Sequence, residues 1–249
     1  KAKAIKTYQE GLAIFPNAGN LYLEIGNVYG FEEDFDQAIK SYEEGIRVDP
    51  MYPSNYFRLA DLFLRSTNKV PGLIYGELFM NIERTTDRTM QMSELLFSTY
   101  QNAININGDS MSIDFCEIIL SIEDLSNTDE FKLPFCAHYG KNMSLAVAFA
   151  KEEEIDLQSL AEIRSQFIDL YFADEASKDY PVVLFDYQKK MKKAGIFDTY
   201  NRYLFQVSNQ EEFNKWLEDH QADFDQFVDW YTAEENIIKI NQENKYIRN

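Results

Sequence analysis

The stretch Ala-Ile-Lys-Ser-Tyr-Glu-Glu-Gly-Ile-Arg-Val-Asp-Pro, residues 38–50, decides how this chain folds. Residues 4–16, Ala-Ile-Lys-Thr-Tyr-Gln-Glu-Gly-Leu-Ala-Ile-Phe-Pro, match it at seven of thirteen positions with a constant offset of 34. A fixed offset of this size indicates an internal repeat, in which one small structural unit occurs more than once.

The repeat extends outward from this stretch. Tyr22, Ile25 and Tyr29 stand 34 residues ahead of an equivalent apolar set, Tyr56, Leu59 and Phe63. A more divergent third copy places small and apolar residues at Gly72, Leu73, Gly76, Glu77 and Phe79. The apolar residues recur at helical spacing in both halves of each copy, so the unit is predicted to be a pair of helices.

These helix pairs resemble the tetratricopeptide repeat. The family's pattern of large, small and proline positions is filled within residues 19–52 by Tyr22, Ile25, Gly26, Tyr29, Ala38, Tyr42, Gly45 and Pro50. The resemblance is close over residues 4–52 and looser over residues 53–84. It implies an all-α fold in which antiparallel helix pairs stack as a right-handed α-solenoid.

We therefore divide the chain near residue 84. Residues 1–84 hold a half repeat at 1–18, a repeat at 19–52 and another at about 53–86. Residues 85–249 form a divergent helical part, which either continues the solenoid or makes a separate bundle. One helix pair cannot cover its own apolar face, so we expect the C-terminal part to cover the helix at 71–83. The helix at 3–14 needs a cover too, either from an N-terminal extension of the native protein or from another element.

Residues 85–249 predict helices with less regular spacing. We expect helices at about 88–104, 109–125, 132–153 and 157–173, with a polar break at 126–131. Pro181 should lie in the first turn of another helix, and Gly195 should follow its end. Ser208 and Glu211 form a capping-box pattern. The last residues, 241–249, are expected to fray.

The charge of the chain is strongly negative and unevenly distributed. Lys and Arg total 24 and Asp and Glu total 42, for a formal net charge of -18, of which residues 85–249 carry -15. This charge disfavours nucleic acid and anionic membrane surfaces as partners. No apolar run approaches the roughly 20 residues of a membrane-spanning helix. The acidic part is either a solvated surface or a face that attracts a basic partner.

Few residues suggest catalysis or metal binding. Cys116 and Cys136 are too few for a disulfide framework, and we expect two reduced thiols rather than a bridge. Cys136 and His138 supply only two of the three or four ligands that zinc requires. The acidic stretch after His220 lacks the glycine of a calcium loop. We therefore predict no enzyme activity, no metal and no cofactor.

The resemblance to the tetratricopeptide repeat implies that the first helix of each unit lines a concave groove. The matching positions that we expect to bind a peptide are Asn20, Leu23, Asn27, Phe57, Asp61 and Leu64, with Gly30 and Ser54 beside them. One subclass of the family clamps the C-terminal carboxylate of a chaperone with Lys and Asn residues. This chain does not fit that subclass, because Leu23 and Arg58 replace two of those residues.

Three functions follow from these observations. The first is a non-catalytic scaffold that binds a peptide or protein segment in the groove. The second is an exported or cell-envelope assembly or adaptor factor that uses the acidic C-terminal region. The third, an enzyme or metal-binding protein, is disfavoured. The partner, the oligomeric state and the compartment stay open, and both a cytoplasmic and an exported (periplasmic) location fit the sequence.

Overall fold

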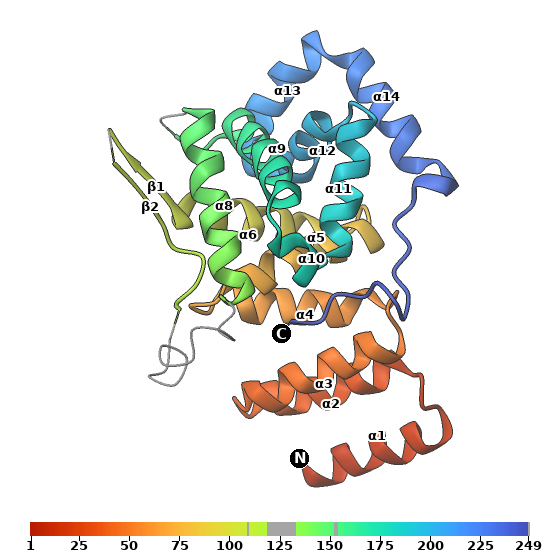
Figure 1. Cartoon of the computed structure of the whole chain (residues 1–249). Coiled ribbons are helices and arrows are strands. Elements are labelled where there is room, and N and C mark those ends of the chain that lie inside the picture. The colour runs from red at the N-terminus through yellow and green to blue at the C-terminus, as the bar shows by residue number, and fades with distance from the viewer. Residues whose placement is uncertain (109, 119–132, 152–153, 249) are drawn as a thin grey trace.

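The computed structural model describes residues 1–108, 110–118, 133–151 and 154–248, and they are mostly helical (73%). Figure 1 shows the first helices stacked in layers at one end of the molecule. The remaining helices gather at the other end, and the C-terminus lies beside α4. The prediction of an all-α fold built from antiparallel helix pairs is confirmed.

The helix pairs keep the period of the sequence. The first helices of successive units begin 34 residues apart: they are α2 (Gly19–Phe31), α4 (Pro53–Leu64) and α6 (Asp87–Ala103). The second helices are α1 (Ala2–Ile14), α3 (Phe35–Val48) and α5 (Val70–Ile82). The regular series therefore reaches residue 103, one helix beyond the part of the sequence that resembles the family.

Equivalent glycines make equivalent contacts in successive units. A Cβ at Gly11 would lie 2.9 Å from the Leu21 side chain, and a Cβ at Gly45 would lie 2.3 Å from the Asn55 side chain. Both members of the first pair are 34 residues ahead of the second pair. The absence of a side chain at these glycines lets each helix approach the first helix of the next unit.

A second contact joins the two helices within a unit. A Cβ at Gly26 would lie 2.3 Å from the Tyr42 ring, so this glycine makes room for the ring between α2 and α3. The Tyr42 hydroxyl donates to Oδ1 of Asn27 across 3.0 Å. Burial of the phenol raises the pKa of Tyr42 to about 12.

In the next unit the large and small residues are exchanged. Gly76 replaces the tyrosine and faces Ala60, so the space of the ring is open. Met92 and Leu96 of α6 fill it, with Met92 Sδ 2.8 Å from the position of a Cβ at Gly76. The divergent third copy is thus adapted to receive α6.

The helix α5 lies at the centre of the molecule, and twelve of its thirteen residues are buried. The C-terminal helices that gather around it are α8 (Phe135–Ala150), α9 (Leu157–Ala173), α10 (Ala176–Asp179), α11 (Val183–Lys193), α12 (Phe197–Phe205), α13 (Gln210–Asp219) and α14 (Gln221–Thr232). Two short 3-10 turns, η1 (Gln206–Asn209) and η2 (Glu234–Asn236), complete the described helical elements. The expected cover of the helix at 71–83 is therefore present.

A buried polar network fastens these helices to α5. Arg164 of α9 donates to Glu77 of α5 across 2.5 Å, and both side chains are only 4% exposed. Gln188 of α11 and Tyr200 of α12 donate to the other oxygen of Glu77 across 2.7 and 2.8 Å. Asn81 of α5 donates to the Tyr200 hydroxyl across 2.7 Å. One carboxylate on α5 thus contacts three C-terminal helices.

A β-hairpin replaces the helix expected at 109–125. Strands β1 (Ile104–Asn107) and β2 (Ser110–Ile113) pair antiparallel, with Ile104 opposite Ile113. Gly108 sits at the turn with φ of +57°. Residues 114–118 are not helical either, so the prediction is wrong over its described part; residues 119–125 and the predicted polar break at 126–131 lie outside the described residues.

The predicted fraying of the C-terminus is also wrong for its described part. Residues 237–248, which we call the tail, run back from α14 to the repeat helices and end beside α4 (Figure 1). Ile238, Ile240 and Tyr246 are 3%, 4% and 8% exposed. Their burial against the core stabilises an extended segment that has no helix or strand of its own.

The other helix boundaries follow the sequence with small shifts. The helices predicted at 88–104 and 157–173 are confirmed as α6 and α9. Pro181 lies just before α11 rather than in its first turn. Asn209, not Ser208, caps α13, and its side chain accepts from the Glu212 backbone N–H across 3.2 Å. Among the described helices, none has the length and apolar character needed to cross a membrane.

Candidate protein-binding surface

The predicted groove lies on α2, α4 and α6, and two of its expected residues are not available there. Leu23 is 8% exposed and Leu64 is 5% exposed, and both belong to the hydrophobic core. Leu64 packs close to Gly72 of α5, whose missing side chain lets the turn between α4 and α5 close tightly. The expectation that these two leucines contact a peptide therefore needs correction.

The polar positions of α2 remain accessible. Asn20 is exposed at the start of the helix, and Asn27 is partly exposed one face along. The side-chain oxygen of Asn27 is occupied by the Tyr42 hydroxyl, which leaves its amide N–H groups available as donors. α2 therefore offers hydrogen-bond donors and acceptors rather than apolar contacts.

Phe57 on α4 is partly exposed and belongs to a small aromatic and cationic cluster. Its ring lies 5.1 Å from the Phe79 ring, and the Arg88 guanidinium lies 5.3 Å from its centroid. Arg88 also donates to Ser54 Oγ across 3.0 Å and pairs with Glu83. Arg88 was not predicted as a site residue, although it stands 34 residues after Ser54 and that offset could have identified it.

Asp61 is the acidic residue of this surface. Its carboxylate pairs with Arg65 one turn further along α4, with 2.8 Å between Oδ1 and the Arg65 Nε. The Asp61 side chain is 36% exposed and that of Arg65 is 68% exposed. The face of α2, α4 and α6, which we call the A-face, thus presents Asn20, Asn27, Phe57, Asp61 and Arg88 as a mixture of amide, aromatic and charged groups.

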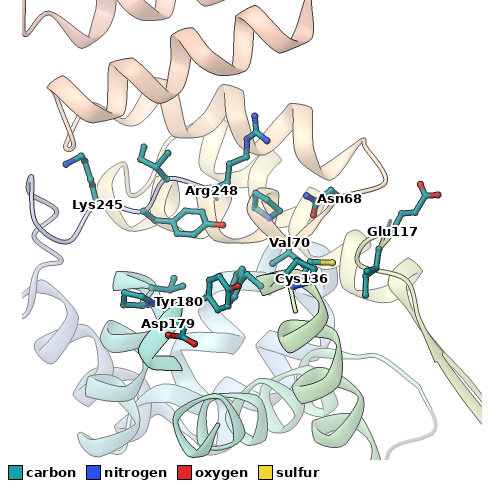
Figure 2. Close-up of a pocket in the computed structure, with 16 residues that line it drawn as sticks. Asn68, Val70, Glu117, Cys136, Asp179, Tyr180, Lys245 and Arg248 are labelled. Atoms are coloured by element: carbon teal, nitrogen blue, oxygen red, sulfur yellow. The ribbon is translucent and has the colours of Figure 1, made fainter. Parts of the chain in front are cut away.

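A hollow of about 700 Å³ lies on a different part of the molecule, between the start of α5, the start of α8 and the tail. Figure 2 shows Tyr180 and Cys136 on one side and the tail on the other, with the Arg248 guanidinium directed away from the hollow. The Asn68 side-chain oxygen is buried without a hydrogen-bond partner. The volume falls within the range of small-ligand pockets.

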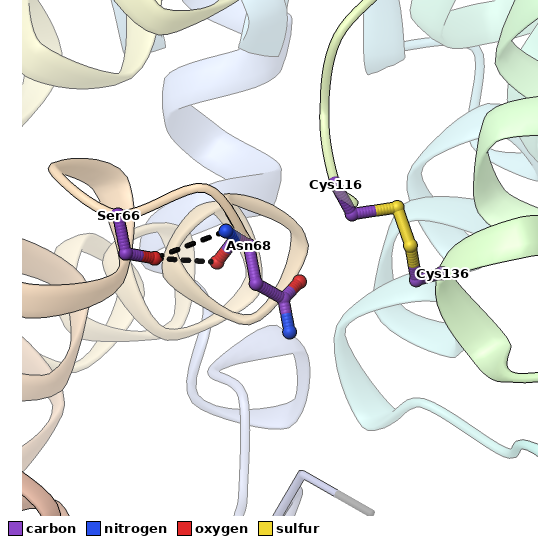
Figure 3. Close-up of a disulfide and its surroundings, with 4 residues drawn as sticks. All are labelled: Ser66, Asn68, Cys116 and Cys136. Atoms are coloured by element: carbon purple, nitrogen blue, oxygen red, sulfur yellow. Dashed lines mark hydrogen bonds between the residues drawn. A yellow bond between two sulfur atoms is a disulfide. The ribbon is translucent and has the colours of Figure 1, made fainter. Parts of the chain in front are cut away.

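A disulfide borders this hollow, contrary to the expectation of two reduced thiols. Cys116 and Cys136 are bonded, with 6.3 Å between their Cα atoms, a separation that suits a bridge. Figure 3 shows the bridge opposite the turn in which Ser66 Oγ bonds the backbone of Asn68. The hairpin, unforeseen in the sequence, carries Cys116 back to the first turn of α8, where Cys136 lies.

The two histidines have local partners. His138 Nδ1 lies 3.7 Å from Asp174 Oδ2, and His220 stacks on Trp216 with 4.9 Å between the ring centroids. In the part of the chain that the structure describes, no three His, Cys, Asp or Glu side chains come together as a metal site would require. The histidine and acidic residues considered in the sequence are therefore dispersed over separate surfaces.

The stacked antiparallel helix pairs define a helical repeat protein, a class whose members present extended surfaces to other proteins. Residues 19–51 match the tetratricopeptide repeat family, which confirms the resemblance seen in the sequence. This repeat indicates protein–protein interaction as the general function. No curated protein and no solved structure matches the chain.

Proposed function

We propose that this protein is a non-catalytic scaffold that binds an extended segment of a partner protein on the A-face. The observation that carries the proposal is the tetratricopeptide repeat at residues 19–51 together with the continuation of its first-helix series through α4 and α6. Three parallel first helices give a surface long enough for several residues of a partner.

The groups on this surface suit an extended peptide. The Asn20 and Asn27 side chains supply amide groups that pair with backbone N–H and C=O groups. Phe57 supplies a ring for an apolar side chain, and Asp61 and Arg88 supply one charge of each sign. A partner with both a basic and an acidic residue flanking an apolar one would complement all three.

Affinity capture with a matched control tests this proposal. The test variant is Asn20→Lys/Asp61→Lys, which adds three positive charges to the A-face at partly or fully exposed positions. The control variant is Gln9→Lys/Glu44→Lys, which adds the same charge to exposed positions on α1 and α3. We expect the test variant to lose partners that the wild type and the control retain, as identified by quantitative mass spectrometry. Equal capture by both variants would refute the A-face as the binding surface.

The disulfide favours a second candidate function, that of an exported adaptor or assembly factor. Disulfides persist in oxidising compartments and are rare in the cytosol, and Cys116 is bonded to Cys136. Cell fractionation combined with thiol alkylation in the native organism tests this candidate. A protein found in the cytosol with both cysteines alkylated without prior reduction would exclude it.

A further inference from the structure

The tail is an extended segment seated on the repeat helices, and its chemistry is matched by theirs. Tyr246 lies against Tyr75 of α5 with 5.1 Å between the ring centroids. The Ile240 backbone N–H approaches Met51 Sδ at 3.4 Å. The segment thus contacts residues on both sides of α4, although it is about 190 residues away in sequence from Met51.

The end of the tail meets a buried carboxylate. Glu43 of α3 is 8% exposed, and its Oε1 accepts from Nε of Arg248 across 2.9 Å. The Tyr75 hydroxyl donates to the same oxygen across 3.3 Å and accepts from the Arg248 backbone N–H across 3.2 Å. The Arg248 guanidinium also lies 5.2 Å from the Phe63 ring centroid. A buried carboxylate needs a cation for compensation, so this seat selects an arginine.

We propose that this surface of α3, α4 and α5 is a second peptide-binding site, filled in cis by the tail and open to a partner segment of the same chemistry. That partner segment is extended and carries a tyrosine and an arginine two residues apart, in the manner of Tyr246 and Arg248. The site lies on Glu43, Phe63 and Tyr75, none of which belongs to the A-face. The inference therefore goes beyond the proposed function and does not depend on it.

The tail is built to be released rather than to be permanent. Residues 241–244 between its two anchored parts are exposed, and their described hydrogen bonds are local, such as those between Asn241 and Asn244. Segments with few buried contacts open at a lower free energy than the helices of a core. While attached, a tethered segment acts at an effective concentration on the order of millimolar. A free peptide at micromolar concentration therefore competes only when the cis seat is weakened.

Fluorescence anisotropy with a labelled peptide of residues 237–248 tests the site in the full chain. The variant Tyr246→Ala/Arg248→Ala removes the cis anchors and leaves the receiving residues intact. We expect it to bind the peptide about tenfold or more tightly than the wild type does. Adding Glu43→Gln should reverse most of this gain. The control Ile237→Ala/Lys239→Ala, at exposed tail positions, should behave as the wild type does.

Three outcomes would overturn the proposal. A folded anchor variant that does not bind the peptide would show that the surface is no site. Equal binding by the wild type and the anchor variant would show that the tail does not compete. A concentration-dependent dimer of the wild type, formed by exchange of tails, would assign the site to a second copy instead of a partner segment.

Amide hydrogen exchange on the wild type keeps the test independent of how well the variants fold. We expect the amides of residues 238–248 to exchange much faster than those of α5, because the tail opens without global unfolding. Equal protection of the tail and α5 would contradict a releasable tail. The A-face variants leave Glu43, Phe63 and Tyr75 unchanged, so failure of the proposed function and failure of this inference are separate results.

Discussion

Arg164 on α9 lies 2.5 Å from Glu77 on α5, and neither side chain has appreciable access to solvent. The guanidinium is also surrounded by the rings of Tyr100, Phe197 and Phe205, whose centroids lie 5.1 to 5.8 Å away. This pair joins the last repeat helix to the C-terminal helices. Its partners Gln188 and Tyr200 satisfy the second oxygen of the Glu77 carboxylate.

Breaking this pair tests its contribution. Arg164→Met should lower the free energy of unfolding by about 3–5 kcal/mol, because it leaves the buried Glu77 carboxylate without its cation. The double variant Glu77→Gln/Arg164→Met removes both charges and should recover most of the loss. Urea unfolding followed by circular dichroism measures both values. A single-variant loss below about 1 kcal/mol would contradict a buried and structurally important pair.

The repeat contacts predict a difference between two glycines. Gly26→Ala should destabilise the chain by about 1–3 kcal/mol, because the new Cβ would enter the space of the Tyr42 ring. Gly140 in α8 has nothing within 4 Å of a Cβ position. Gly140→Ala should therefore stabilise the chain by up to about 1 kcal/mol through helix propensity. Thermal unfolding of both variants measures the contrast, and equal effects would argue against close packing at Gly26.

The disulfide should stabilise the fold. The bridge closes a loop with a sequence separation of 20, and loops near this length are stabilised by about 3 kcal/mol. Cys116→Ser/Cys136→Ser should lower the free energy of unfolding by about this amount. The wild type under reducing conditions should behave as the variant does. A wild type whose stability does not respond to reductant would show that the bridge does not form in solution.

Burial raises the pKa of Glu43 above its ordinary value of 4.5, although Arg248 and the Tyr75 hydroxyl oppose this effect. The folded state therefore holds this proton more strongly than the unfolded state does. The contribution of Glu43 to stability is greatest below pH 4.5 and declines as pH rises through its folded pKa. The wild type should lose stability relative to Glu43→Gln between about pH 4 and pH 7. A difference that stays constant or moves the other way contradicts a raised pKa.

The repeat helices could be predicted from sequence because their contacts are local and periodic. Gly26 meets Tyr42 and Gly45 meets Asn55 within about one repeat length, so spacing alone indicates the pairing. Leu23 and Leu64 were misplaced for a related reason. Family position indicates which way a side chain points, whereas burial depends on the neighbouring helix, here close packing around Gly72 for Leu64.

The C-terminal features could not be predicted in the same way, with one exception. Arg248 and Glu43 are 205 residues apart, and Arg164 and Glu77 are 87 apart, so no local pattern joins either pair. The hairpin did leave a signal. Asn107-Gly108 between alternating apolar and polar residues favours a two-residue turn, and it also explains how Cys116 reaches Cys136.

The central claim is that the C-terminal helices and the tail complete the repeat stack as one cooperative unit around α5. Trp216 and Trp230 lie on α13 and α14, so tryptophan fluorescence reports the C-terminal part while far-ultraviolet circular dichroism reports all helices. In urea unfolding of the full chain, the two signals should give coincident transitions with the same midpoint. Separate transitions, with fluorescence changing while a large fraction of helix persists, would contradict a single unit.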